Sequence, residues 1–118
     1  MEFYYHDVDK DVLILSADGG LCAETAEQFV EELNRFVDLG MRKLIVDCTR
    51  LTHLSSYGMG ILVRLRKRLA QQGGNVKLAA VPGVVARVIR LVRLDRVFQI
   101  FPTVDAALRS FHDESETD

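Results

Sequence analysis

Short apolar segments that alternate with amphipathic helical patterns are the feature of this sequence that most restricts its fold. Residues 43–48 (KLIVDC) and 76–81 (VKLAAV) are nearly continuous apolar runs. Such runs are typical of strands that are covered on both faces. Each run follows a segment with the spacing of an amphipathic helix. Strands that alternate with helices in this way favour a mainly parallel sheet with helices packed against it.

The complete pattern predicts one α/β domain with the element order ββαβαβαβα. The first two strands, at residues 3–8 and 11–16, are expected to form a hairpin with its turn at residues 9–11, which makes the sheet mixed. Gly19 and Gly20 are expected to break any regular element. The later strands are predicted at residues 43–48, 76–81 and 97–101, and about four helices at residues 25–37, 56–69, 82–92 and 103–111.

Local signals place several helix ends. Thr25 and Gln28 have the spacing of a capping box, and Gly40 stands where a C-terminal glycine belongs. Pro82 is typical of a helix start, and Thr103 is a predicted N-cap.

Length and charge limit the domain organisation and the partners. The 118 residues suffice for one domain, predicted at residues 1–111. Residues 112–118 lack apolar side chains and form an acidic tail that is expected to fray. The net charge is −2, and without the tail it is about +2, which is too weak to drive nonspecific nucleic-acid binding. No nucleic acid is therefore expected as a partner.

The N-terminus and the two cysteines indicate the compartment. The first residues, MEFYYHDVDK, lack the blocks of a secretory signal, and no apolar run approaches the roughly 20 residues that span a bilayer. We therefore expect a cytoplasmic protein without direct membrane insertion. Cys22 and Cys48 are expected as reduced thiols that fill the core or its margin.

Arrangements typical of enzymes and cofactor sites are weak in this sequence. Ser55 and Ser56 lack the upstream glycine of a nucleophile elbow, although a triad with His53 and Asp47 is conceivable from proximity alone. The histidines at positions 6, 53 and 112 are scattered, so no metal is expected. A phosphate-binding P-loop is absent. The sequence therefore predicts no enzyme, no cofactor and no metal site.

Two helices carry clustered basic residues. One group comprises Arg64, Arg66, Lys67 and Arg68, and the other comprises Arg87, Arg90 and Arg93. They are either the solvated faces of amphipathic helices or a charged docking surface for an acidic protein.

Ser56 is the residue with the strongest indication of function. A serine at this helix start can accept a hydrogen bond from a free backbone N–H group as a cap. The positive end of the helix dipole would also stabilise a phosphate on its hydroxyl. Gly58 and Gly60 lack side chains and would let another surface approach closely. Ser56 can thus be both a cap and a switch.

The segment LTHLSSYGMGIL, which follows a strand ending at Asp47, resembles the STAS domain, and particularly the bacterial anti-sigma-factor antagonists. These proteins commonly have D-S-x-G-x-G at this helix start. Ser56, Gly58 and Gly60 match this pattern, with Tyr57 and Met59 at the variable positions. Upstream, GGLCAETAEQF is similar to the family's G-x-[LI]-D-x-x-[TS]-A segment, and the matching residues are Gly19, Leu21, Thr25 and Ala26. The resemblance covers the chain from about Phe3 to Phe111.

The resemblance implies a docking protein that is switched by phosphorylation. Its partner would be an anti-sigma factor, often a serine kinase of the histidine-kinase-like ATPase fold, and binding would free a sigma factor for transcription. Phosphorylation would fall on Ser56, with Ser55 as second choice, and would release the partner. The implied contact residues are Tyr57, Gly58, Met59, Gly60 and Ile61. A PP2C-type phosphatase is a further candidate partner.

Two positions depart from the family pattern. Ser55 and Cys22 stand where the family usually has aspartates. Their absence lessens the repulsion of a phosphate but also removes contacts that a kinase can use to orient the hydroxyl. The alternative is therefore an unmodified STAS subunit of an ABC transporter or of a signalling scaffold. A small enzyme or nucleotide-binding protein is a more distant alternative.

Overall fold

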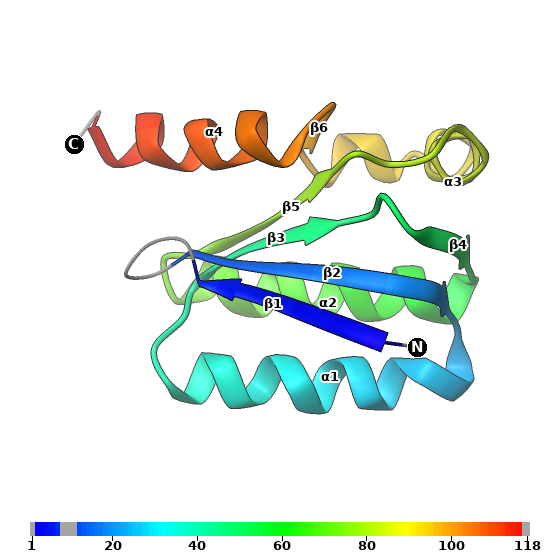
Figure 1. Ribbon diagram of the computed structural model, residues 1–118, viewed down its shortest axis with the longest axis horizontal. Helices are drawn as coiled ribbons and strands as arrows, with labels where there is room; N and C mark the ends of the chain where they lie inside the picture. Colours follow the sequence, from blue (N-terminus) through cyan, green and yellow to red (C-terminus); the bar gives the residue numbers. More distant parts are fainter. Residues whose placement is uncertain (1, 8–11, 117–118) are drawn as a thin grey trace.

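The protein folds into one mixed sheet with helices on both faces (Figure 1). The computed structural model describes residues 2–7 and 12–116. The strands are β1 (Glu2–Asp7), β2 (Val12–Leu21), β3 (Lys43–Asp47), β4 (Leu51–Leu54), β5 (Asn75–Ala79) and β6 (Ile100–Phe101). The helices are α1 (Ala23–Asp38), α2 (Ser56–Gln71), α3 (Gly83–Leu91) and α4 (Val104–Glu116), with a 3₁₀ turn, η1, at Leu94–Arg96.

The strand order confirms the predicted mixed and mainly parallel sheet. The main sheet runs β1-β2-β3-β5-β6, and β4 pairs with the end of β2. Strand β1 is antiparallel to β2, as a hairpin requires, and the other pairs are parallel. The turn predicted at residues 9–11 lies outside the described residues. Strand β3 lies between β2 and β5, and its apolar run is covered on both faces as expected, because Leu44 and Val46 are buried on one side of the sheet and Ile45 on the other.

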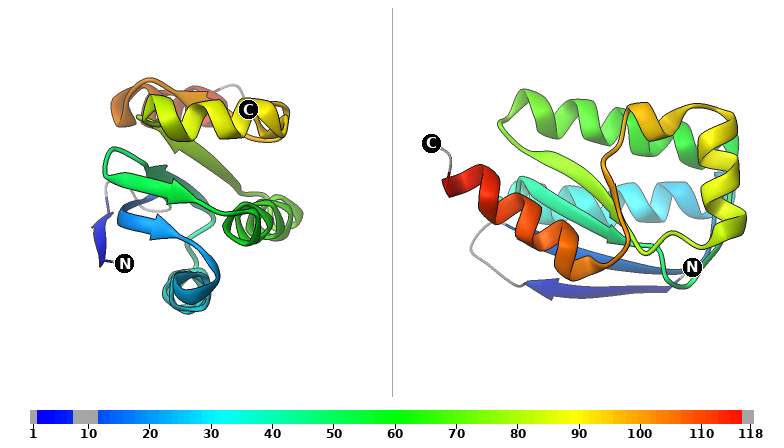
Figure 2. Two further views of the ribbon diagram at one scale, coloured as in Figure 1. Left: turned by 90° about the vertical axis from the view of Figure 1, so that its right-hand side faces the viewer. Right: turned by 90° about the horizontal axis from the view of Figure 1, so that it is seen from above.

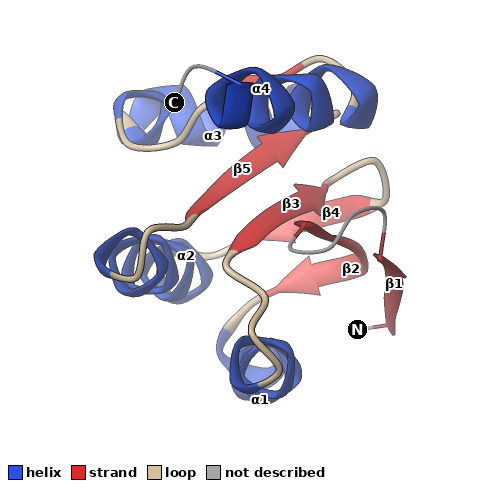
Figure 3. Cartoon of the chain, turned by 90° about the vertical axis from the view of Figure 1, so that its left-hand side faces the viewer, coloured by secondary structure: helices blue, strands red, loops and turns tan. Residues whose placement is uncertain are grey.

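Successive side chains of the central strands enter two different apolar layers. In β2, Leu13 and Leu15 belong to the larger layer under α1 and α2, whereas Val12 and Ile14 belong to a smaller layer under α4. This alternation follows from the two-residue period of a strand. Figure 3 shows α1 and α2 on one side of the sheet and α4 on the other. Helix α3 lies at one end of the molecule (Figure 2). It contacts β4, and its Val85 and Ile89 side chains belong to the larger layer.

The sequence analysis was wrong about residues 17–21 and 51–54. Strand β2 continues through Gly19 and Gly20 to Leu21, because β4 offers it a parallel partner. The register shifts between the two glycines, and Gly19 has φ of +110°, a conformation that glycine adopts without strain. Strand β4 has only four residues, and the sequence pattern predicted no strand there.

The predicted helix ends are partly confirmed. Gly40 has φ of +99° directly after the C-cap of α1, Pro82 is the N-cap of α3, and the Thr103 hydroxyl accepts a bond from the N–H of Ala106 at 3.0 Å. The capping box of α1 pairs Cys22 with Thr25, so the predicted pair of Thr25 with Gln28 is wrong.

The last strand and the last helix also differ from the prediction. The predicted strand at residues 97–101 is reduced to β6, because η1 and the residues after it carry the buried Phe98. Helix α4 continues through Glu116, since no proline or glycine follows Phe111. Among the described residues, no helix has the length and the apolar character needed to cross a membrane.

Lys77 is fully buried beneath α4. Its Nζ donates to Ser110 Oγ at 2.6 Å and lies 4.0 Å from the centre of the Phe111 ring. A buried ammonium group needs such partners to offset its lost hydration. Lys77 therefore joins β5 to α4 as a structural residue.

Candidate functional site

The site begins at the N-terminus of α2, where Ser55 and not Ser56 is the cap. Ser55 has an extended backbone with φ −81° and ψ 167°, and its Oγ accepts a hydrogen bond from the N–H of Gly58 at 3.0 Å. Its carbonyl accepts the N–H of Met59 at 2.9 Å, which is the first hydrogen bond of the helix. The capping role proposed for Ser56 is therefore wrong by one residue.

Ser56 occupies the first helical position and its side chain is exposed. An N–H group in the first turn of a helix has no carbonyl partner within that helix. Ser55 satisfies the N–H of Gly58, and those of Ser56 and Tyr57 have no partner among the described residues. The Ser56 hydroxyl is thus exposed next to two backbone N–H groups that have no hydrogen-bond acceptor among the described residues.

The two glycines of α2 have different environments. Gly58 is buried, and a Cβ atom there would lie 2.5 Å from the carbonyl oxygen of Leu21. The close approach that Gly58 permits is therefore made by the protein's own β2, and the expectation that it leaves room for another molecule is wrong. Gly60 is half-buried, and the nearest atom to its Cβ position is Arg64 Nη2 at 4.0 Å. Gly60 alone of the pair leaves space at the surface.

The other predicted contact residues divide between surface and core. Tyr57 is 46% exposed, which is unusual for so large a side chain. Met59 and Ile61 are half-buried and pack against the larger apolar layer. Of the five residues that the sequence indicated, Tyr57 presents the most side chain to a partner.

The start of α1 adjoins the start of α2. The N–H of Ser55 donates to the carbonyl of Leu21 at 3.0 Å, and Leu21 precedes Cys22, the N-cap of α1. Thr25 fixes this second cap, because its hydroxyl donates to the Gly20 carbonyl at 2.8 Å and accepts from the Cys22 N–H at 3.0 Å. Two positive helix ends therefore lie side by side.

The first turn of α2 contains no acidic residue. The family pattern has aspartates at the positions of Ser55 and Cys22. Ser55 donates the hydrogen bond to Leu21, and Cys22 follows Leu21 in the sequence. The positive potential of these helix ends is thus not offset by a carboxylate at either position.

The structure gives no support to a catalytic triad or a metal site. The Asp47 carboxylate accepts hydrogen bonds from Ser16 Oγ at 3.1 Å and Thr49 Oγ1 at 2.6 Å. Within residues 2–7 and 12–116 no hydrogen bond joins it to His53, or His53 to Ser56. Nor does this part of the chain bring three candidate ligands together for a metal ion.

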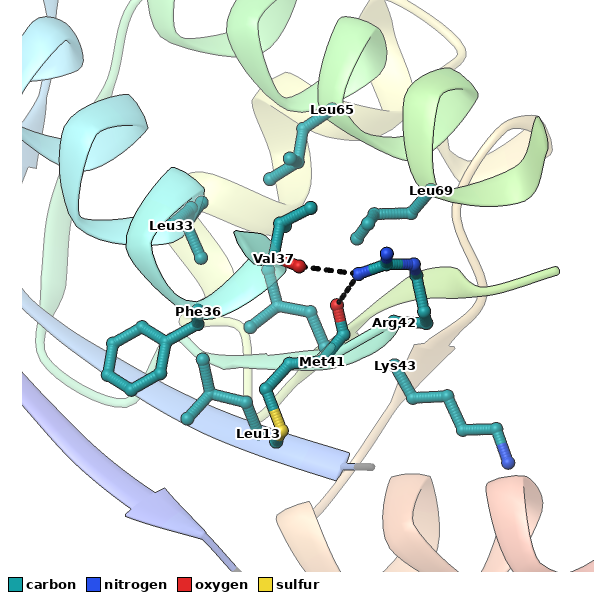
Figure 4. A pocket seen from close by; sticks show the side chains of 10 residues that line it. Leu13, Leu33, Phe36, Val37, Met41, Arg42, Lys43, Leu65 and Leu69 are labelled. Carbon is teal, nitrogen blue, oxygen red and sulfur yellow. Dashed lines mark hydrogen bonds between the residues drawn. The ribbon is translucent and has the colours of Figure 1, made fainter. Parts of the chain in front are cut away.

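A small apolar pocket lies at the opposite end of the helices, between α1, α2 and β2 (Figure 4). Its volume is about 10 Å³, which is about the space of one water molecule. Arg42 closes the end of α1 there by donating to the carbonyls of Val37 at 2.7 Å and Met41 at 3.0 Å (Figure 4). The pocket is a packing defect and not a ligand site.

The two cysteines form no disulfide and differ in environment. Cys22 is half-buried and Cys48 is buried. Burial raises the pKa of the Cys48 thiol to about 12, and the Asp47 carboxylate acts in the same direction. The structure confirms Cys48 as a core residue and places Cys22 at the helix cap.

The fold and this helix start define an α/β domain with an exposed serine at a helix N-terminus, and the comparisons agree with that class. The family model of the STAS domain matches residues 6–107, and the chain belongs to the STAS family.

Its relatives bear the names of anti-sigma factor antagonists. The anti-sigma-F factor antagonist RsfB of Mycobacterium tuberculosis is 30% identical over 99 residues, which is 82% of this chain and 79% of RsfB. The crystal structure of an anti-sigma factor antagonist from Mycobacterium paratuberculosis has a TM-score of 0.80 and 25% identity, and the match covers 92% of each chain. This protein is therefore an anti-sigma factor antagonist-like STAS protein, and the expectation of a binding protein instead of an enzyme agrees with these names.

The fold is also that of SpoIIAA. The unphosphorylated form of that antagonist matches with a TM-score of 0.82 and 18% identity over 95% of this chain and 97% of SpoIIAA. The phosphorylated form of the Bacillus protein matches with a TM-score of 0.73 over 93% and 99%. At this identity the likeness concerns the fold.

The sequence located the start of α2 but did not reveal the contacts within it. It identified the helix start, yet it gave the cap to Ser56 and did not predict that the Leu21 carbonyl accepts the N–H of Ser55 and faces Gly58. The spacing of Ser55 and Gly58 was a usable signal, since a cap accepts from the third helical residue.

Proposed function

We propose that this protein is a docking switch that binds an anti-sigma factor through the start of α2 and is released when Ser56 is phosphorylated. The observation that supports the proposal is that two adjacent serines have different structural roles. Ser55 caps the helix, so the Ser56 hydroxyl is left exposed and without a structural task.

Ser55 is the poorer acceptor of a phosphate. It is half-buried and its Oγ holds the N–H of Gly58, so its modification would break the cap. Modification of Ser56 leaves that bond in place. The Ser56 phosphate would lie beside the unused N–H groups of the first turn, where a helix stabilises an anion.

The change in binding follows from charge and from burial. A phosphate adds about −1.5 to −2 charges at neutral pH. In a contact that includes Tyr57, Met59, Gly60 and Ile61, this charge would have to be desolvated or would face the carboxylates of the partner. The partner would be released while the fold stays intact. The partner is expected to be a serine kinase of the histidine-kinase-like ATPase fold, acting in the cytoplasm, with a PP2C-type phosphatase resetting the switch.

A phosphopeptide experiment tests the site of modification. Trypsin cuts after Arg50 and Arg64, so one peptide, residues 51–64, carries both serines. In protein purified from its own host, this peptide should gain about 80 Da, with the added mass assigned to Ser56 by fragmentation. The Ser56→Ala variant should lack that species. Protein that stays unmodified while the switch is in use would contradict the proposal and favour a transporter or scaffold subunit.

A binding experiment tests the consequence. Ser56→Asp should weaken binding to the cognate anti-sigma factor by about tenfold or more, whereas Ser56→Ala should stay within about twofold. Gln72→Asp, at the far end of α2, adds the same charge away from the contact and should leave affinity unchanged. Equal affinity of Ser56→Asp and wild type would refute the switch.

A further inference from the structure

The near-neutral net charge conceals a strong separation of charge along the chain. Residues 48–94 contain nine arginine and lysine residues and no aspartate or glutamate. This part of the chain forms β4, α2, β5 and α3. All the acidic residues lie before or after it, so one region of the molecule is strongly basic.

Three exposed arginines of this region lie on α3 or just after it. Arg87 and Arg90 are exposed on the helix, and the exposed Arg93 follows its C-cap, Val92. Elsewhere Arg50 pairs with Asp18 at 3.6 Å, and Arg68 bonds to Asn34. Within the described residues, none of the three α3 arginines has a carboxylate within ion-pair distance.

The same helix exposes aliphatic side chains beside these arginines. Val84 is 77% exposed and Leu91 is 75% exposed. At about 100° per residue, two positions seven residues apart lie about 20° apart on the helix surface. Val85 and Ile89 are buried on the other side, so α3 has an inner apolar face in the core and an outer apolar strip. Val92, which is 50% exposed, lies at the end of the helix beside Leu91.

We propose that this outer face of α3 is a docking surface for an acidic amphipathic helix of a protein partner. The face is defined by Val84, Arg87, Arg90, Leu91, Val92 and Arg93. Carboxylates on such a helix would pair with the arginines, and its apolar stripe would cover the aliphatic strip. The positive charge of the arginines requires an acidic partner. The aliphatic strip requires that this partner also have an apolar stripe.

Other occupants match only half of this surface. Nucleic acid offers phosphates but no aliphatic groups for Val84 and Leu91. A membrane-binding helix needs a broad apolar face, whereas α3 has nine residues and its other face is fixed in the core. A second copy could offer its acidic α1, but the exposed positions among residues 25–38 of that helix are polar.

Helix α3 lies at the end of the molecule where α1 and α2 begin (Figure 2, left). The inference goes beyond the proposed function, because it depends neither on Ser56 nor on phosphorylation.

Two synthetic peptides provide the test. One is a helical peptide of about 18 residues, built of leucine, alanine and glutamate with all leucines on one face. The other has the same composition with its leucines spread around the helix. Fluorescence anisotropy should show that the full-length protein binds the first peptide at least about fivefold more tightly than the second, and that salt weakens the binding. Equal binding of both peptides would overturn the proposal, because charge alone would then explain it.

Matched variants locate the binding. Leu91→Ser should weaken it at least about fivefold, and the double variant Arg87→Glu/Arg90→Glu at least about tenfold. Two changes should leave affinity within about twofold: Leu39→Ser, at a leucine that is 79% exposed at the end of α1, and Arg109→Glu, at an exposed arginine of α4. Circular dichroism checks that each variant is folded. Loss of binding in the control variants to the same extent would overturn the assignment to α3.

Three further outcomes would refute the choice of partner. Tighter binding to a random-sequence DNA duplex, tighter binding to phosphatidylserine vesicles, or self-association that Leu91→Ser abolishes would each assign the face to another occupant. Ser56→Asp should bind the peptide like wild type, so failure here leaves the Ser56 switch standing, and failure of that switch leaves the α3 surface standing.

Discussion

The hydroxyl of Ser55 accepts the N–H of Gly58 at 3.0 Å, and this single bond separates the roles of two adjacent serines. Ser55 is committed to the helix, whereas Ser56 is exposed next to it. The folding role and the signalling role of the segment can therefore be altered one at a time.

Removing the two hydroxyls should have unequal effects on stability. Ser55→Ala loses the cap and should lower the free energy of unfolding by about 1 kcal/mol. Ser56→Ala should change it by less than about 0.5 kcal/mol, since its side chain is exposed. Urea unfolding followed by circular dichroism measures both. If Ser56→Ala lowered the free energy of unfolding more than Ser55→Ala, Ser56 and not Ser55 would be the cap.

The glycines of α2 should respond in opposite directions to alanine. In Gly58→Ala the new methyl group meets the Leu21 carbonyl at 2.5 Å, so backbone must move, and a loss of about 2 kcal/mol or more is expected. Gly60→Ala meets only the flexible end of Arg64 at 4.0 Å and should gain up to about 1 kcal/mol from helix propensity. Thermal unfolding of the two variants side by side is the measurement. Equal effects of the two substitutions would contradict the contact between Gly58 and β2.

The contact between Gly58 and Leu21 makes Gly58 a poor position for a substitution that tests partner binding. Gly58→Val would damage the fold by collision with Leu21 before it could hinder a partner. Gly60 is the better position for blocking an interface, since a side chain there has open space around it.

The sequence predicted those strands and helices whose apolar pattern depends only on the face that each residue occupies. The apolar runs of β3 and β5 and the periodicity of the helices are such patterns, because each residue follows the face it occupies. Strand β4 and the end of β2 were not predicted, because each segment becomes a strand only by pairing with the other. Gly19 to Leu21 become a strand when Leu51–Leu54 pairs with them, and no propensity of either segment reveals that pairing.

The start of α2 was predictable to within one residue for the same reason. The spacing of Ser56, Gly58 and Gly60 located the helix start, but the exact cap depends on where the chain leaves β4. The bond from the Ser55 N–H to the Leu21 carbonyl sets that point, and it joins residues far apart in the sequence. The arginines of α3 were predicted as either solvated or docking residues, and only the exposure of Val84 and Leu91 beside them favours docking.

Cys48 should make the stability of the protein depend on alkaline pH. Its pKa rises from an ordinary 9.0 to about 12 in the folded protein, mainly because the thiolate would be buried without water. Below pH 9 the thiol is protonated in both states and costs nothing. Between pH 9 and 12 the unfolded chain releases the proton while the folded protein keeps it, so the free energy of unfolding falls by up to about 1.4 kcal/mol per pH unit.

Substitution of Cys48 isolates this contribution from that of other groups. Cys48→Ala should show a shallower loss of stability than wild type between pH 9 and 10.5, by about 2 kcal/mol over that interval. Its stability at pH 7 should be lower than that of wild type, because the removed sulfur leaves a small cavity. Urea unfolding at a series of pH values gives the two curves, and parallel curves for wild type and Cys48→Ala would mean that the Cys48 thiolate is accommodated in the folded protein.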